Sequence, residues 1–111
     1  MIRPVRIQLS RRKGFDLQAL SLATNGLPAV RVARPGIFGN PFAVGRDGDR
    51  AQCVEKFARK IRAAQKRSLG TDPLATRILR NLVRIRGCNL ACWCKSGEPC
   101  HADVLLEIAN Q

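Results

Sequence analysis

Three of the five cysteines in this 111-residue chain and its single histidine fall within one short stretch, CWCKSGEPCH at residues 92–101. Cysteine sulfur and imidazole nitrogen are ligands that zinc prefers, and a cysteine thiolate is also a nucleophile. These residue types predict a metal site, a reactive thiol, or a pocket that binds an anion without covalent chemistry.

The metal interpretation uses Cys92, Cys94, Cys100 and His101 as four ligands in the spacing C-x-C-x5-C-H. Residues two apart on a strand share a face, so Cys92 and Cys94 are expected to point the same way. Four such groups could bind structural zinc tetrahedrally. Against this, the spacing is not that of a zinc finger or ribbon, and adjacent residues such as Cys100 and His101 diverge by about 100° on a helix. Zinc therefore remains an open alternative.

The reactive-thiol interpretation starts from Cys100, which follows Pro99 where the last helix is predicted to begin. Free backbone amides and the helix dipole favour an anion there, so Cys100 is predicted to carry a thiolate. It would act as the catalytic nucleophile, with His101 as the acid or base. The competing interpretation is structural: Cys92 and Trp93 would pack in a buried strand, and His101 would cap the helix or pack against it.

A second candidate site lies in the loop ARPGIFGNPF at residues 33–42, which is rich in turn-forming residues. It matches neither the P-loop nor the dinucleotide-binding fingerprint. Either it is a wound connection with ordinary turn geometry, or Arg34 binds a phosphate, the glycine amides form an anion-binding nest, and Asn40 hydrogen-bonds a base or a ribose. On the second interpretation, the ligand-binding residues are Arg34, Gly36, Gly39, Asn40 and Cys94.

The charge of the chain indicates an anionic partner. Twenty Lys and Arg residues stand against eight Asp and Glu, a formal net charge of +12, which favours a nucleotide or a nucleic acid. We expect no membrane binding, because no stretch is long and apolar enough to span a bilayer and no helix has bulky apolar residues opposite a basic face. An odd number of clustered cysteines, and an opening sequence unlike a signal peptide, predict a cytoplasmic protein with reduced thiols.

Hydrophobic periodicity predicts a small single-domain α/β sandwich, with a short, mostly parallel sheet and three helices. Residues 1–27 are interpreted as a basic N-terminal extension with a short strand, and residues 28–111 as the core domain. The predicted strands cover about residues 5–10, 30–32 and 88–94, and the predicted helices cover about residues 50–66, 73–86 and 99–110.

Local signals support these helices. Asp49 and Gln52 form a capping-box pattern ahead of the first, and Asp72 is the expected N-cap of the second. A helical crossover between the second and third strands would make those strands parallel neighbours. The loops that carry both candidate sites would then follow the carboxyl ends of the strands, where this class of fold binds its ligands.

Two separated stretches, ARPGIFGNPFAVGRDGDRAQCVEKFARKI and LACWCKSGEPCHADVLLEIAN, resemble the small bacterial and phage family catalogued as domain of unknown function 4326, over roughly residues 28–110. The family pattern is an Arg-Pro-x-x-x-Gly-Asn-Pro-Phe loop, a helix, and a Cys-x-Cys then Cys-His block. The resemblance implies that these positions matter but supplies no reaction. In this chain, Lys95-Ser96-Gly97 stands where a proline commonly follows the Cys-x-Cys. The matched residues are Arg34, Pro35, Gly39, Asn40, Pro41, Phe42, Cys92, Cys94, Cys100 and His101.

The leading functional hypothesis is a phage-related α/β domain that binds a phosphate-bearing ligand, either a nucleotide or a nucleic acid. The ligand would lie where the stretch at residues 92–101 meets the loop at residues 33–42. Thiol-based catalysis at Cys100 remains open within it, and so does the question whether the protein is an enzyme. One alternative is a metal-stapled nucleic-acid-binding module without catalysis. Another is a small basic interaction protein whose partner is an acidic protein.

Overall fold

Strand β3 (Asn89–Cys92) is the central strand of a three-stranded sheet, between β1 (Arg6–Gln8) and β2 (Ala29–Arg31). The computed structural model describes residues 2–66 and 72–111. Both pairings with β3 are parallel, which confirms the predicted parallel arrangement of the second and third strands. β1 comes from the predicted N-terminal extension and is hydrogen-bonded into the same sheet as the core strands.

The central strand is buried along its whole length. All four residues of β3 lie below the surface, as expected for a strand covered on both faces of a parallel sheet. Its first residue, Asn89, is nevertheless polar and fully buried. Its side chain accepts hydrogen bonds from the Val5 backbone at 2.9 Å and from Asn25, and it donates to Ser21 Oγ at 2.8 Å. Asn89 therefore connects β3 to the segment before β1 and to the first helix.

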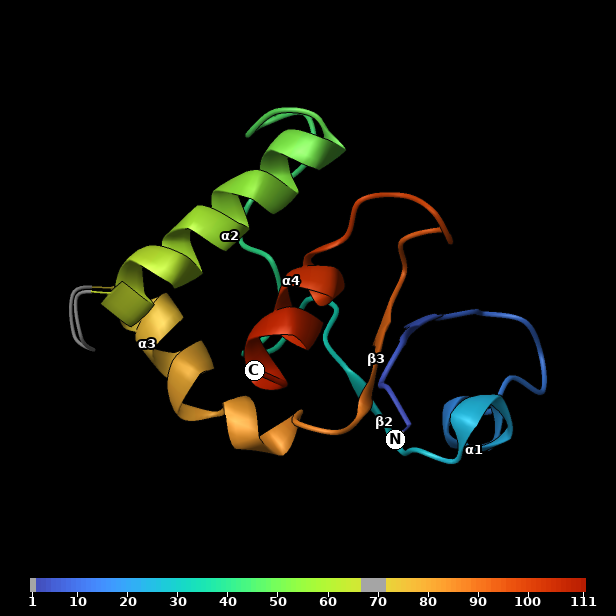
Figure 1. Ribbon diagram of the computed structural model, residues 1–111. Coiled ribbons are helices and arrows are strands. Elements are labelled where there is room, and N and C mark those ends of the chain that lie inside the picture. The colour runs from blue at the N-terminus through green and yellow to red at the C-terminus, as the bar shows by residue number, and fades with distance from the viewer. Residues whose placement is uncertain (1, 67–71) are drawn as a thin grey trace.

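Helix α4 (His101–Ala109) packs against β3 and β1, and α2 (Arg50–Lys66) packs against α4, with α3 (Pro73–Arg80) beside α2 (Figure 1). The prediction of a helix over residues 50–66 is confirmed, and its capping box forms: the backbone amides of Asp49 and Gln52 each donate to the other's side-chain oxygen at 2.8 Å. The largest fully buried apolar side chains of the core include Phe57, Ile61, Ile78, Ile85, Leu90 and Leu105.

The described residues form four helices, where the sequence predicted three. The additional helix, α1 (Leu17–Asn25), is capped by Asp16, which accepts from the Ala19 amide, and it ends at Gly26 in the left-handed conformation. Figure 1 places it beside the strands, away from α2 and α3. Periodicity missed this helix because Ser21 is its only buried residue, so it carries almost no apolar stripe.

The second predicted helix is shorter than expected. Asp72 caps it as predicted, but α3 ends at Arg80 and a 3₁₀ turn follows at Leu82–Arg84. Asn81 explains the interruption, because its side-chain amide donates to the Arg77 carbonyl at 2.7 Å and its backbone departs from helical geometry. The apolar stripe continues across the break, which is why the pattern predicted one continuous helix.

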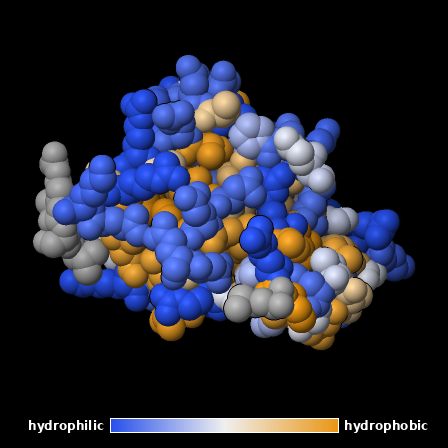
Figure 2. All heavy atoms as spheres, in the orientation of Figure 1, coloured by the Kyte–Doolittle hydropathy of each residue, from blue (hydrophilic) through white to orange (hydrophobic). Residues whose placement is uncertain are grey.

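Hydrophilic residues cover most of the face seen in Figure 2. Apolar residues gather at its lower right, around α1. Leu20 and Leu22 of that helix are exposed, as are Ile2 and Val5 before β1. None of the described helices is long and apolar enough to cross a membrane.

Candidate functional site

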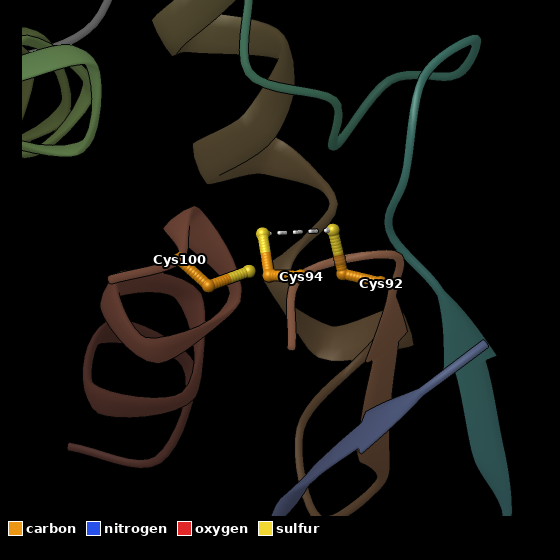
Figure 3. Close-up of side chains that lie close together, drawn as sticks. All are labelled: Cys92, Cys94 and Cys100. Atoms are coloured by element: carbon orange, nitrogen blue, oxygen red, sulfur yellow. Dashed lines mark hydrogen bonds between the residues drawn. The ribbon is translucent and has the colours of Figure 1, made fainter. Parts of the chain in front are cut away.

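The sulfur atoms of Cys92, Cys94 and Cys100, here called the cysteine cluster, all lie within 4.8 Å of one another. Cys92 ends β3, Cys94 is in the turn that follows, and Cys100 immediately precedes α4 (Figure 3). The Cys92 and Cys94 sulfurs are 3.9 Å apart, although Cys94 lies beyond the end of the strand. The cluster could hold a metal ion.

Arg6 positions the turn that carries Cys94. Its guanidinium donates to the Glu98 carbonyl at 2.8 Å and the Lys95 carbonyl at 3.2 Å, and it pairs with Asp103 of α4 at 2.9 Å. The side chain is only 14% exposed, so these bonds are partly shielded from water. One residue of β1 thus ties together the two elements that supply the cluster. Sequence reasoning missed Arg6, because an arginine in a short strand carries no local signal of such a role.

The position of Cys100 relative to the last helix differs from the one that the sequence predicted. Helix α4 begins at His101, so Cys100 is the N-cap residue rather than part of the first turn, and Pro99 lies before the helix. A hydrogen bond with Cys92 and burial raise the pKa of Cys100, which is 1% exposed. The same hydrogen bond and the nearby His101 hold the pKa of Cys92 well below its usual range. Within this pair, these contacts favour the charged form at Cys92 over Cys100, the cysteine at which the sequence placed the thiolate.

His101 is buried and faces the sheet rather than the centre of the cluster. Its Nε2 lies 2.8 Å from the Val32 carbonyl, and because a carbonyl can only accept, Nε2 carries the hydrogen. Its Nδ1 lies 3.9 Å from the Cys100 sulfur, and its ring meets the Phe57 ring edge-on at 5.4 Å. The three-sulfur group therefore does not include His101, although the sequence offered it as a fourth metal ligand.

A cleft of about 470 Å³ opens over the cysteine cluster. Four arginines line it, and none of the described residues that line it is an aspartate or a glutamate. We call it the arginine cleft. The arginines come from four separate segments: the one after β1, β2, the loop after β2, and the start of α2. The other lining residues are Ala33, Asn40, Phe42, Val44, Cys53, Val54, Cys92, Trp93, Cys94, Pro99, Cys100 and His101.

Arg50 connects the cleft to the cysteine cluster. Its Nη1 donates to the Cys94 sulfur at 3.4 Å, and its Nε pairs with Glu98 at 3.5 Å. Arg11 stacks on Trp93, with its guanidinium carbon 4.3 Å from the ring centroid, and Arg31 lies 5.7 Å from the same ring. The sequence did not single out these three arginines, since only the net charge of the chain hinted at them.

The predicted ligand-binding residues of the loop divide into two groups. Arg34 and Asn40 line the arginine cleft together with Cys94, whereas Gly36 and Gly39 do not. The Gly39 amide donates to the Gly36 carbonyl at 3.3 Å, so it is engaged within the turn. The Asn40 side chain is also used locally, since it accepts from the Phe42 amide at 2.9 Å and donates to the Cys53 carbonyl at 3.2 Å. Arg34 is exposed, and its guanidinium has no hydrogen-bond or ion-pair partner among residues 2–66 and 72–111.

Gly39 leaves room for Arg34 to reach the cleft. A methyl group at Gly39 would lie 2.6 Å from Arg34 Cγ and 3.2 Å from Arg34 Cα. We expect Gly39→Ala to lower the free energy of unfolding by about 1–3 kcal/mol, because either the loop or Arg34 must shift. In a double-mutant cycle followed by urea unfolding, Arg34→Ala removes the clashing Cγ and should recover part of that loss. Strictly additive costs would contradict this contact.

Comparison with known families decides the classification. The model of the family described as Domain of unknown function (DUF4326) matches residues 17–111. The chain belongs to this family. The match includes α1 and all of the cleft-lining segments except the one that carries Arg11. Neither the comparison with curated proteins nor that with solved structures gives a match.

Proposed function

We propose that this member of the DUF4326 family binds a phosphate-bearing ligand, a nucleotide, in the arginine cleft. The observation that carries the proposal is the composition of the cleft: four guanidinium groups and no carboxylate among the described lining residues. Its volume of about 470 Å³ is within the roughly 300–1,000 Å³ of small-molecule sites. Arginine suits phosphate because its planar fork can donate two parallel hydrogen bonds.

Different walls of the cleft suit different parts of a nucleotide. Arg34 offers a free guanidinium, and Arg50 lies beside the cysteine cluster. Phe42, Val44 and Trp93 supply apolar surface for a base or a sugar. The base would stack on an aromatic side chain while the phosphate contacts the arginines, a division common in nucleotide recognition.

The test is calorimetric titration with inorganic phosphate, adenosine monophosphate and a short single-stranded oligonucleotide, at low and high salt. We expect adenosine monophosphate to bind more tightly than phosphate, and more weakly at high salt. Arg34→Gln should weaken binding about 10- to 100-fold, the cost of one charge-assisted hydrogen bond. Its melting temperature should not change, because the guanidinium has no partner among the described residues.

Arg77→Gln is the matched control, since it removes the same charge from α3 at a position that does not line the cleft. It should leave the affinity nearly unchanged. Equal losses in the two variants would show that binding depends on net charge alone. No binding of phosphate or of adenosine monophosphate would overturn the proposal, and binding of the oligonucleotide alone would favour a nucleic acid as the partner.

A second candidate function is a metal-stapled nucleic-acid-binding module, with zinc in the cysteine cluster. The convergence of three sulfurs favours it, together with the exposed basic side chains of α2. Some of these are already paired, Arg59 with Glu55 and Arg62 with Glu107, so less of this surface is free than the net charge indicates. This candidate predicts oligonucleotide binding that Arg34→Gln does not affect.

The free thiols of all five cysteines suit a reducing compartment such as the cytoplasm.

A further inference from the structure

The spacing of the cysteine sulfurs matches a metal site more closely than a disulfide. Zinc bound tetrahedrally at about 2.3 Å from each thiolate places the sulfurs about 3.8 Å apart. The Cys92 and Cys94 sulfurs are 3.9 Å apart, and none of the three separations exceeds 4.8 Å. A disulfide would need a separation of about 2 Å. A zinc ion therefore fits with small side-chain adjustments.

Among the described residues, the protein supplies three ligands here and no fourth. In residues 2–66 and 72–111, no other Cys, His, Asp or Glu joins this group. His101 donates from Nε2 to the Val32 carbonyl, and its Nδ1 lies 3.9 Å from the Cys100 sulfur but outside the group of mutually close ligand atoms. Cys53 lines the same cleft, but its sulfur lies 3.8 Å from the Gly48 carbonyl and outside the group. Three protein ligands with one open position are typical of catalytic rather than structural zinc.

The open position faces the arginine cleft, because all three cysteines line it. Three thiolates and one Zn²⁺ carry a net charge of −1, which the surrounding guanidinium groups offset. Arg50 contacts the cysteine cluster directly, since its Nη1 donates to the Cys94 sulfur at 3.4 Å. Such an N–H to sulfur bond holds a metal ligand in place.

We propose that Cys92, Cys94 and Cys100 bind one zinc ion whose fourth coordination position is open to the arginine cleft and is taken by an exchangeable ligand. The metal site depends only on the cysteines, whereas its use toward a nucleotide rests on the proposed function. An open position would place a zinc-bound water, or a donor atom of the bound ligand, beside the arginines that we assign to the phosphate.

The experiment loads the full-length protein with Zn²⁺ and, separately, with Co²⁺ as a spectroscopic probe. We expect one metal per chain and a sulfur-to-cobalt charge-transfer band. Imidazole added to the cobalt protein should change the d–d absorption, because it enters the open position. Uptake without any change on adding imidazole would show a closed site, and no uptake would overturn the metal site itself.

Variants identify the ligands. Cys94→Ser should lose stoichiometric uptake, and it is the safest substitution because Cys94 is only half-buried. Cys53→Ser is the matched control, since Cys53 also lines the cleft but lies outside the cluster. Equal uptake by both variants would contradict the assignment. Phosphate binding is measured separately in metal-free protein, so loss of the metal site and failure of the phosphate proposal give different results.

Discussion

Replacing His101 with alanine should lower the free energy of unfolding by about 3 kcal/mol, with a fall in melting temperature of about 12 °C or more. The imidazole is 6% exposed, donates to the Val32 carbonyl at 2.8 Å and packs edge-on against Phe57. Removing it leaves a cavity and a buried carbonyl without its hydrogen bond. Urea unfolding followed by circular dichroism measures the loss.

His101→Phe separates the two contributions, because it keeps a ring against Phe57 but cannot donate to the Val32 carbonyl. It should cost about 1–2 kcal/mol. Glu107→Ala on the same helix is the control, since its exposed ion pair with Arg62 is worth less than about 1 kcal/mol. If His101→Ala kept full stability and lost only ligand or metal binding, His101 would be a site residue, as the sequence predicted, rather than a structural one.

Asn89→Ala should have a comparable effect, again about 3 kcal/mol. Asn89 is fully buried, and its side chain joins the Val5 backbone, Asn25 and Ser21. The alanine leaves the partly buried Val5 amide without its partner, whereas Ser21 and Asn25 lose their bonds to Asn89 and keep those to the Leu27 backbone. Because β1 pairs only with β3 in the described sheet, amide hydrogen exchange should also accelerate in β1.

Two controls distinguish the network from the mere loss of an amide. Asn110→Ala removes an exposed amide that donates to the Leu106 carbonyl and accepts from the Gly87 amide, and it should cost about 1 kcal/mol. Asn89→Leu fills the space but restores no hydrogen bond, so it should remain as destabilised as the alanine variant. Recovery of stability in Asn89→Leu would show that the polar network contributes little.

Local sequence signals located much of the fold. The capping box at Asp49 and Gln52 and the apolar spacing after it predicted α2 with its observed bounds. The continuous apolar run around Leu90 predicted a strand buried on both faces. The one polar residue in that run, Asn89, was a visible signal of a buried network, but its partners at the other end of the chain could not be read from it.

The three cysteines of the cluster lie within nine residues of one another in the sequence. The predicted strand over residues 88–94 ends earlier, at Cys92, so the turn that follows β3 brings the Cys94 sulfur to 3.9 Å from the Cys92 sulfur, and Cys100 follows just before α4. These are separations of a few residues, and local backbone geometry controls them.

Only the tertiary structure shows which groups from distant parts of the chain lie in contact. The Nε2 of His101 donates to the carbonyl of Val32, which is 69 positions away, while its Nδ1 stays beside the Cys100 sulfur. Arg6 holds the turn after β3 from 92 residues away, and four arginines from separate segments line one cleft. Local propensity and periodicity carry no information about such long-range contacts, which depend on how the strands pair and the helices pack. The sequence by itself determined which residues could bind a metal and their order along the chain. Only the folded chain decided that the three sulfurs line a basic cleft and that the histidine donates a hydrogen bond to the Val32 carbonyl.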